Sequence, residues 1–452
     1  MFKKILFSLF FISYIAQSQH VVKGTMTGDN NYEWVILYQL KGLSQNYIAN
    51  VDVVSGVFKI TIPENTPKGM YRISYDLQNN GYVDFIHNNE SVDMEFDPKN
   101  QLETLHFITS EENKLFANYV NEVELIRQNL DSIQLTFFKS VEEEQKEGLK
   151  ELYNLTFKNY TNLQTNYEAN SVGKLAHHFI KANKKYYAPQ IINAPQEYLN
   201  SEKVHFFDFI DFNDNELRNS VLINQKVIDY VFYLSQSDDA QVQTALYKNA
   251  VVEVMQKIGD NNSLASEVCA TLMFAFTQIQ NVTLVDFTLE SIYKKLPKEY
   301  VDAAVVLEVE SKIKLAIGKV APDFSWNVKG KQQKLSSISN ANTYMLVFWS
   351  TTCSHCLLEV PELYEYTKNT KNLQVIAVSL ENDELGFKVY SEKFTKWTNV
   401  LGLEKWQNNI AQQYNITSTP TYFILDASKK IIAKPAHLQD VKAFLLEHSS
   451  PK

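Results

Sequence analysis

Two cysteines separated by two residues, Cys353 and Cys356, are the side chains of this sequence best suited to do chemistry. The apolar run from Tyr344 to Trp349 predicts a strand buried on both faces, and the segment from Cys356 to Lys368 predicts a helix. Cys353 then falls at the first helical turn, where unpaired backbone N–H groups and the helix dipole favour a thiolate. His355, between the cysteines, can add a positive charge or a donated hydrogen bond.

The chemistry that this pattern indicates is thiol-disulfide exchange. A lowered pKa makes a cysteine nucleophilic near neutral pH. With this spacing, Cys353 attacks a disulfide, and Cys356, one turn away, resolves the mixed disulfide. Cys-x-x-Cys pairs also occur in zinc sites, but the order of strand, cysteines and helix favours the redox interpretation. We therefore expect neither a metal nor a cofactor.

A Thr419-Pro420 pair stands directly before the apolar run Tyr422-Phe-Ile-Leu-Asp426, which predicts a further strand. A proline in this place is unfavourable unless its fixed geometry is needed, and cis peptide bonds are nearly confined to X-Pro. Such a turn leaves the backbone of Thr419 free to pair with an extended substrate segment. We expect Thr419, together with Trp349, to contribute to substrate binding.

These residues resemble the active site of the thioredoxin superfamily, and more closely its secreted branch of TlpA and ResA type. The resemblance covers roughly residues 315 to 449. It rests on Ala321-Pro-Asp-Phe324, Phe348-Trp349, Cys353, Cys356, Glu359, Pro361 and Thr419-Pro420-Thr421. The resemblance implies that Cys353 and Cys356 are the redox pair and that Pro420 is cis and packs against them. Glu359 matches an acidic residue that this branch carries three positions after the second cysteine.

The sequence departs from thioredoxin at several positions near the cysteines. Val347 stands where thioredoxin has a buried aspartate, so Glu359 either takes the role of proton acceptor or is a solvated, partly paired helix residue. Thr352 replaces a tryptophan. Ser354-His355 replaces Gly-Pro, and a histidine in this place is similar to DsbA and protein disulfide isomerase. Because a stabilised thiolate raises the reduction potential, we predict a potential less reducing than the ~−270 mV of thioredoxin.

The N-terminus predicts export. Met1-Phe-Lys3-Lys4 is positive, Ile5 to Ile15 is apolar but short for a bilayer span, and Ala16-Gln17-Ser18 is a small-x-small cleavage signal. We expect a signal peptide over residues 1–18 that is cleaved. The alternative is an uncleaved N-terminus that anchors the protein in the membrane. The family resemblance implies the periplasm of a Gram-negative bacterium.

The net charge and the cysteine content exclude some classes of partner and of fold. The chain has 452 residues and a formal net charge of −9, which argues against nucleic acid or an anionic membrane surface as partner. Three cysteines are too few for a structural disulfide framework in so long an exported chain. Cys269 lies in an apolar helical stretch and is interpreted as a buried, inert thiol; the alternative is a third redox centre.

The hydrophobic pattern divides the chain into three domains after the signal peptide. Residues 19–100 contain short alternating strands and predict an antiparallel β-sandwich. Residues 101–314 contain long amphipathic runs and predict a helical middle domain. Residues 315–452 predict an α/β thioredoxin-like domain, the expected site of the chemistry.

Two polar groups in the helical segment resemble metal sites only weakly. His177 and His178 are adjacent and so point apart on a helix, whereas helical zinc sites use i,i+4 spacing. Asp208, Asp211 and Asp214 lack the turn glycine and distal glutamate of a calcium loop. We interpret these aspartates as turn and helix-cap residues.

The function that the sequence favours is disulfide exchange with exported protein substrates, served by an unidentified membrane or periplasmic electron partner. Reductase, oxidase and isomerase share one such active site. Another hypothesis is an envelope protein that binds a partner or glycan, with an ancillary redox domain. A peroxiredoxin-like peroxidase is a weaker hypothesis, because Leu346 and Ser350 stand where its Pro-x-x-x-Thr-x-x-Cys run needs proline and threonine.

Overall fold

The structure is a computed structural model, and it describes residues 20–28, 31–42, 44–328 and 330–449. The signal peptide expected over residues 1–18 lies outside the described residues. The chain forms two compact units, the first ending at Thr271 and the second beginning at Leu272. This division is coarser than the three domains expected from the sequence, whose boundaries stay predictions.

Short strands open the first unit, as their alternating pattern predicts. They form two four-stranded sheets with the orders β4-β1-β7-β8 and β3-β2-β5-β6. The elements are β1 (Val21–Met26), β2 (Trp34–Lys41), β3 (Ser44–Asp52), β4 (Val57–Thr61), β5 (Gly69–Asp76), β6 (Gly81–His87), β7 (Val92–Phe96), α1 (Gln101–Thr104) and β8 (His106–Phe107). Side chains of both sheets share one core, among them Phe58 and Val22 from one and Leu37 and Ile73 from the other. One pairing departs from an antiparallel arrangement, because β1 and β7 run parallel.

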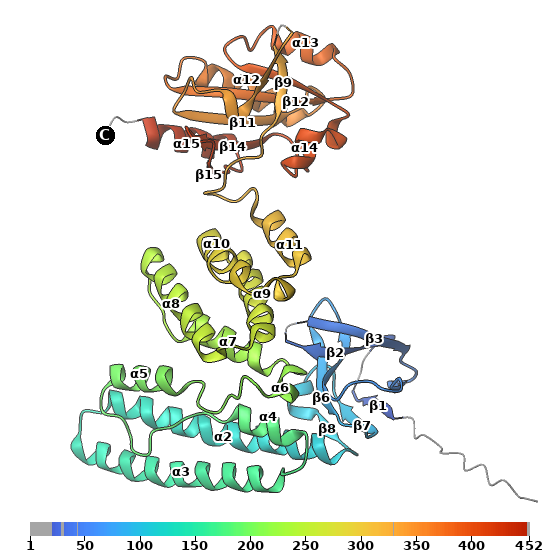
Figure 1. Ribbon diagram of the computed structural model, residues 1–452, viewed down its shortest axis with the longest axis vertical. Helices are drawn as coiled ribbons and strands as arrows, with labels where there is room; N and C mark the ends of the chain where they lie inside the picture. The colour runs from blue at the N-terminus through green and yellow to red at the C-terminus, as the bar shows by residue number, and fades with distance from the viewer. Residues whose placement is uncertain (1–19, 29–30, 43, 329, 450–452) are drawn as a thin grey trace, which may run out of the picture. The chain divides into compact units, whose positions relative to one another are not determined.

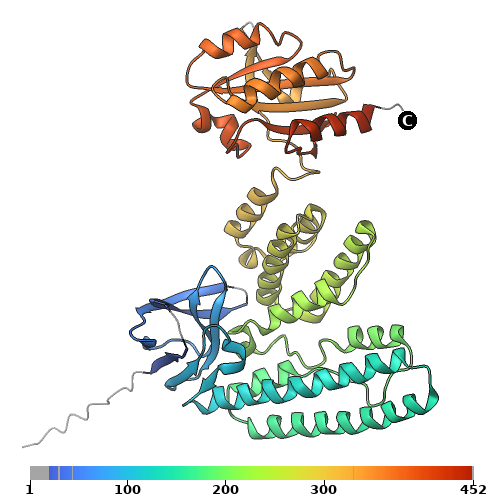
Figure 2. The same cartoon turned by 180° about the vertical axis from the view of Figure 1, so that it is seen from behind.

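The helical middle region expected from the sequence is confirmed. It contains α2 (Glu111–Lys139), α3 (Glu143–Asn170), α4 (Ala176–Asn183), α5 (Pro195–His205), α6 (Asn215–Arg218), α7 (Leu222–Tyr233), α8 (Ala240–Ile258) and α9 (Asn262–Gln278). The long helices α2 and α3 lie side by side in both views (Figures 1 and 2). Between them, the buried hydroxyl of Tyr119 donates to Gln164 Oε1 at 2.9 Å. Ser110 and Asp239 cap α2 and α8 with their side-chain oxygens.

A polar junction joins the edge strand β6 to helices α2 and α4 within the first unit. The Asn113 Oδ1 accepts the N–H of Ile86 at 2.7 Å, and Asn113 Nδ2 donates to the Ile86 carbonyl at 2.7 Å. Beside it, Glu112 accepts the N–H groups of Leu175 at 3.1 Å and Ala176 at 2.8 Å, at the start of α4. Both side chains are buried. The junction therefore satisfies backbone groups that would otherwise be buried without a partner.

The second unit begins with the end of α9 and leads to a five-stranded sheet of order β13-β12-β11-β14-β15. Its remaining elements are α10 (Val282–Ser291), η1 (Tyr293–Lys295), η2 (Lys298–Tyr300), α11 (Ala303–Ile313), β9 (Ser325–Val328), β10 (Lys331–Lys334), η3 (Leu335–Ser337), β11 (Thr343–Trp349), α12 (Ser354–Thr367), β12 (Leu373–Glu381), α13 (Leu385–Ser391), β13 (Thr398–Leu403), η4 (Lys405–Gln407), α14 (Asn409–Gln413), β14 (Thr421–Asp426), β15 (Ile431–Ala433) and α15 (Leu438–Ser449). Strand β11 runs parallel to β12 and antiparallel to β14. The α/β fold expected at this end of the chain is confirmed.

The central strand β11 is buried on both faces, which explains its unbroken apolar sequence. Leu346 and Phe348 face a core that includes Tyr414, just after α14. Val347 and Trp349 face the other core, to which α12 and α15 contribute. Since β11 and β12 are parallel, their carboxyl ends meet at one edge of the sheet, and the cysteines follow β11 at this edge.

None of the helices in the described residues combines the length and the apolar character that crossing a bilayer requires.

Candidate active site

Cys353 is the N-cap residue of α12, in the short turn that leaves β11. Its Sγ accepts the backbone N–H of Cys356 at 3.2 Å, and its own N–H donates to the Ser350 carbonyl at 3.2 Å. The structure therefore places Cys353 at the start of the helix, as the sequence indicated. Cys353 is partly exposed, whereas Cys356 is buried beneath it, and both are free thiols. A substrate can reach the first sulfur and not the second.

The surroundings of Cys353 lower the pKa of its thiol. Burial alone would raise this pKa. Hydrogen bonds from the Cys356 thiol and the Thr419 side chain, and from the backbone N–H groups of Cys356 and His355, outweigh burial. The thiolate at position 353 is therefore the favoured form at a pH where an ordinary cysteine is still protonated.

Cys356 behaves in the opposite way. Burial raises the pKa of its thiol to about 12, and the hydrogen bond that it donates to Cys353 acts in the same direction. The two sulfurs share one proton unequally, so Cys353 carries the charge and Cys356 keeps the proton. This is the division of labour that an attacking and a resolving cysteine require.

The two pKa shifts predict different alkylation profiles in the reduced protein. Because the pKa of Cys353 is lowered, its reaction with iodoacetamide will rise with pH through a midpoint below ~8.5, the ordinary cysteine value. Cys356 will stay unmodified through pH 9, since its pKa is about 12. Mass spectrometry of labelled peptides between pH 5 and about 9 measures both. Equal profiles for the two cysteines would contradict the geometry.

The loop before β14 lies against the cysteines. The Thr419–Pro420 peptide bond is cis, as the sequence predicted. The Cys353 Sγ lies 3.3 Å from the carbonyl oxygen of Thr419, so the protonated thiol can donate to it. The structure thus brings Thr419, the residue before the cis proline, together with Cys353.

Trp349 is buried in the core, whereas His355 is exposed at the surface. Trp349 is 2% exposed and packs against Phe394 and Tyr390, with ring centroids 5.7 and 5.5 Å apart. It therefore supports the end of β11 from within the core and does not present a surface to a substrate. His355 is exposed on the first turn of α12, and its backbone N–H is among the donors to Cys353.

Glu359 has a partner that the sequence analysis missed. The buried hydroxyl of Tyr422 donates to Glu359 Oε2 at 3.1 Å. The pKa of this tyrosine is raised by burial first, then by the charge of Glu359 and by charges on Cys356 and Cys353. Tyr422 is paired across the sheet with Val347, the position where thioredoxin has its aspartate. A signal was present, because the alternation of β14 puts Tyr422 and Ile424 on the same face.

A second missed residue is Glu381, the last residue of β12. The parallel register pairs Ser379 with Trp349, so Glu381 falls two residues farther along, beside the loop that precedes Cys353. Its carboxylate accepts hydrogen bonds from Ser350 and Thr351. The sequence does contain a signal for this contact. Three hydroxyl residues stand directly before Cys353, and an acidic residue ends the apolar strand β12.

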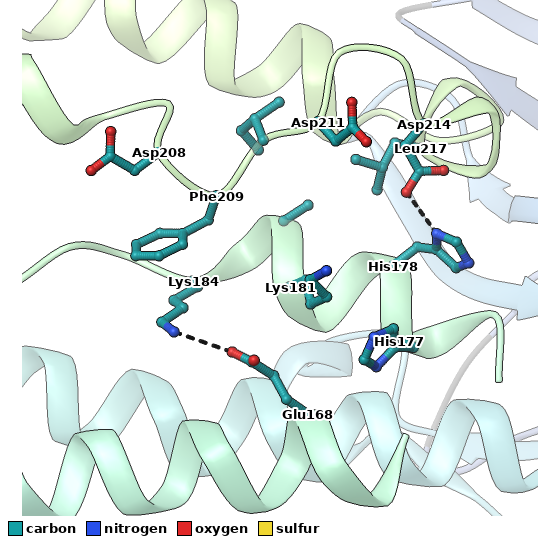
Figure 3. Close-up of a pocket in the computed structure, with 12 residues that line it drawn as sticks. Glu168, His177, His178, Lys181, Lys184, Asp208, Phe209, Asp211, Asp214 and Leu217 are labelled. Atoms are coloured by element: carbon teal, nitrogen blue, oxygen red, sulfur yellow. Dashed lines mark hydrogen bonds and ion pairs between the residues drawn. The ribbon is translucent and has the colours of Figure 1, made fainter. Parts of the chain in front are cut away.

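A separate cavity of ≈ 490 Å³ lies in the helical part of the first unit (Figure 3). His178 Nδ1 lies 2.6 Å from Asp214 Oδ2, and Lys184 pairs with Glu168 at 3.3 Å, so two of the acidic side chains in its wall have partners. The Nδ1 of His177 lies 2.9 Å from the hydroxyl of Ser171. In the part of the chain that the structure describes, no group of three or more histidine, cysteine or acidic side chains gathers as a metal site.

Two of the three aspartates near this cavity have the turn and cap contacts that the sequence predicted, whereas the Asp208 carboxylate pairs with His205 Nδ1 at 2.6 Å. Asp211 Oδ1 accepts the N–H of Asn213 at 2.9 Å. Asp214 caps α6 by accepting the N–H of Glu216 at 2.9 Å. Cys269 is buried, as predicted, with its Sγ 3.8 Å from Met255 Sδ, and burial raises its pKa to about 12.

Known proteins resemble the unit that carries the cysteines. A family model described as thioredoxin-like matches residues 340–431. The thiol-disulfide oxidoreductase ResA of Geobacillus kaustophilus is 29% identical over 141 residues, which cover 30% of this chain and 79% of that protein. ResA of Bacillus thuringiensis is 30% identical over 125 residues, covering 27% of this chain and 70% of that protein. Among solved structures, a thiol-disulfide oxidoreductase from Bacteroides fragilis is 28% identical and covers 28% of this chain and 98% of its own, with a TM-score of 0.26.

The match to the Bacillus thuringiensis protein spans more than two thirds of that relative, and the family model covers the strand, both cysteines and the cis-proline loop. The resemblance drawn from the sequence is thereby confirmed. The chain belongs to the TlpA- and ResA-like thiol-disulfide oxidoreductases of the thioredoxin superfamily.

Proposed function

We propose that this protein is a periplasmic oxidoreductase that exchanges disulfides with exported protein substrates through Cys353-Ser-His-Cys356. The observation that carries the proposal is the opposite state of the two sulfurs. Cys353 is accessible and surrounded by hydrogen-bond donors, whereas Cys356 is buried and protonated beneath it. Thr419 and Pro420 offer the substrate a docking edge beside the reactive sulfur.

In the reducing direction, the Cys353 thiolate attacks one sulfur of a substrate disulfide. A bond forms between the two sulfurs, and the other substrate sulfur leaves as a thiolate. Cys356 then loses its proton and attacks Cys353, which releases the second substrate thiol and leaves a Cys353–Cys356 disulfide. Two electrons have passed to the substrate, and a membrane or periplasmic dithiol partner returns them. The oxidising direction reverses these steps.

Glu359 is our candidate for the group that takes the proton from Cys356. Val347 offers no acceptor, and the Tyr422 hydroxyl links Glu359 to the neighbourhood of both cysteines. His355, exposed beside Cys353, is our candidate for adding positive charge to the site when it is protonated.

The remaining domains and the location complete the proposal. The signal peptide over residues 1–18 directs the chain to the periplasm and is cleaved; retention of an uncleaved N-terminus would anchor it to the membrane instead. Residues 19–100 form a β-sandwich, which is supported by the core that the two sheets share.

Trapping of substrates tests the function directly. In a Cys356→Ser variant the resolving step is lost, so substrates will accumulate as mixed disulfides on Cys353 and be released by reductant. The matched control is the Cys353→Ser/Cys356→Ser double variant, which will trap nothing. If the single variant traps no more exported protein than the double variant, the proposal fails.

The hydrogen bonds to Cys353 also predict the redox poise. They stabilise the reduced form, so the reduction potential will lie above ~−270 mV, the thioredoxin value. Equilibration of the purified protein with mixtures of reduced and oxidised glutathione, followed by quenching and mass analysis, measures this potential. A value at or below that of thioredoxin would show that the donors do not stabilise the thiolate enough to matter.

A further inference from the structure

Three hydroxyl residues, Ser350, Thr351 and Thr352, form the loop directly before Cys353. This loop lies over the side chain of Glu381, which ends β12 and is only 3% exposed. A buried carboxylate is unfavourable unless hydrogen bonds satisfy it. The hydrogen bonds that the Glu381 carboxylate accepts therefore indicate its structural role.

Glu381 accepts four hydrogen bonds, and three of them come from the loop. The backbone N–H and Oγ1 of Thr351 donate at 2.6 and 2.9 Å, and the Ser350 Oγ donates at 3.2 Å. The fourth donor is the Ser379 Oγ at 2.6 Å, from the same strand as the glutamate. The carboxylate thus binds the loop to the end of β12 through backbone and side chains together.

The hydrogen bonds continue from this carboxylate to the surface. The hydroxyls of Ser350 and Thr352 lie 3.0 Å apart, and the Lys405 Nζ donates to Thr352 Oγ1 at 3.0 Å. Lys405 reaches this place from a backbone turn with a φ of 45°. On another side, Gly386 lies so close that a Cβ there would be 2.2 Å from Thr351 Oγ1. Thr351 is therefore closely packed against Gly386 as well as hydrogen-bonded to Glu381.

The same loop contacts both cysteines. The Ser350 carbonyl accepts the N–H of Cys353 at 3.2 Å, which fixes the entry into α12. A backbone hydrogen bond from Ser350 also reaches the Cys356 sulfur. Any movement of Ser350 and Thr351 would change how the two sulfurs are held.

We propose that Glu381 is a positioning residue of the redox site: its buried carboxylate holds the Ser350–Thr352 loop, and through this loop it sets the reactivity of Cys353 and Cys356. The inference rests on the proposed function, because it assigns a role within disulfide exchange. Glu381 does not touch the reacting sulfurs and acts only through the loop.

The test compares Glu381→Ala and Glu381→Gln. The matched control is Glu392→Ala, which changes an exposed glutamate in the segment that connects β12 to β13. Two quantities are measured on the full chain: the rate of exchange with oxidised glutathione and the pH midpoint of Cys353 alkylation. Glu381→Ala will slow exchange about tenfold, the factor that corresponds to one buried hydrogen bond, and will raise the midpoint. Glu381→Gln keeps an oxygen for the Thr351 N–H and will stay within about threefold of the unchanged protein. The control will match the unchanged protein in both quantities.

The outcomes separate this inference from the proposed function. If the unchanged protein does not exchange with glutathione, the proposed function fails, whatever Glu381 does. If the unchanged protein reacts and folded Glu381→Ala matches it in both rate and midpoint, the positioning role is overturned. Should Glu381→Ala not fold, Thr351→Val removes the 2.9 Å hydrogen bond while keeping the side-chain shape. It will slow exchange by about threefold, and no change in this variant would then overturn the inference.

Discussion

Cys353→Ser will abolish disulfide exchange, with a loss of at least ~10³-fold in the rate of substrate reduction. The reason is the position of this sulfur: it is the partly exposed member of the pair, and the surrounding donors stabilise it as a thiolate. A serine hydroxyl at the same N-cap position can still cap α12, but it stays protonated and cannot form a disulfide. Fold and helix should survive while the chemistry is lost.

Reduction of insulin by the protein in the presence of dithiothreitol, followed by turbidity, measures the effect. Cys269→Ser is the control, because that thiol is fully buried in the first unit and its pKa is about 12. The control should retain activity within about twofold, provided that it folds. Retention of a tenth or more of the activity by Cys353→Ser would show that another group is the nucleophile.

Asn113→Ala will destabilise the first unit by about 3 kcal/mol, since it leaves the N–H and the carbonyl of Ile86 without their partner in a buried place. For a unit of this size the corresponding fall in Tm is about 6–12 °C. The backbone of edge strand β6 uses the asparagine amide in place of a further strand, so alanine cannot replace it.

Thermal unfolding followed by circular dichroism measures the loss. The matched control is Asn121→Ala, an exposed asparagine on the same helix, which should change Tm by less than about 2 °C because alanine suits a helix interior. If both variants unfold at the same temperature, the amide of Asn113 is not important for stability.

The parts of the site that could be predicted from the sequence are those built by neighbouring residues. Cys353 follows a buried strand and precedes a helix within a few residues, so its place at the N-cap follows from local pattern. The cis bond before β14 could likewise be expected from Thr419-Pro420 and the strand after it. In both cases chain connectivity alone brings the interacting groups together.

The parts that escaped prediction depend on the register between strands that are far apart in sequence. Glu381 reaches Thr351 only because Ser379 is paired with Trp349, and Tyr422 comes to its place only because it is opposite Val347. Trp349 was expected to contact a substrate, but two aromatic neighbours from the segment after β12 cover it. The parallel pairing of β1 with β7 joins residues about seventy positions apart, which short strands do not reveal.

The junction at Asn113 and Glu112 determines how this protein can be cut for laboratory work. A recombinant fragment that began at residue 101 would contain both side chains but not Ile86, and these buried polar groups would lose part of their partners. Conversely, a fragment that ended at residue 100 would expose the edge of β6 to other chains and invite aggregation. Expression of the whole first unit, with all of α9, is therefore the sounder design, because it keeps every member of the junction in one polypeptide. It also keeps the hydrogen bonds from the N–H groups of Gly42 and Met70 to the carbonyls of Ser220 and Asn219.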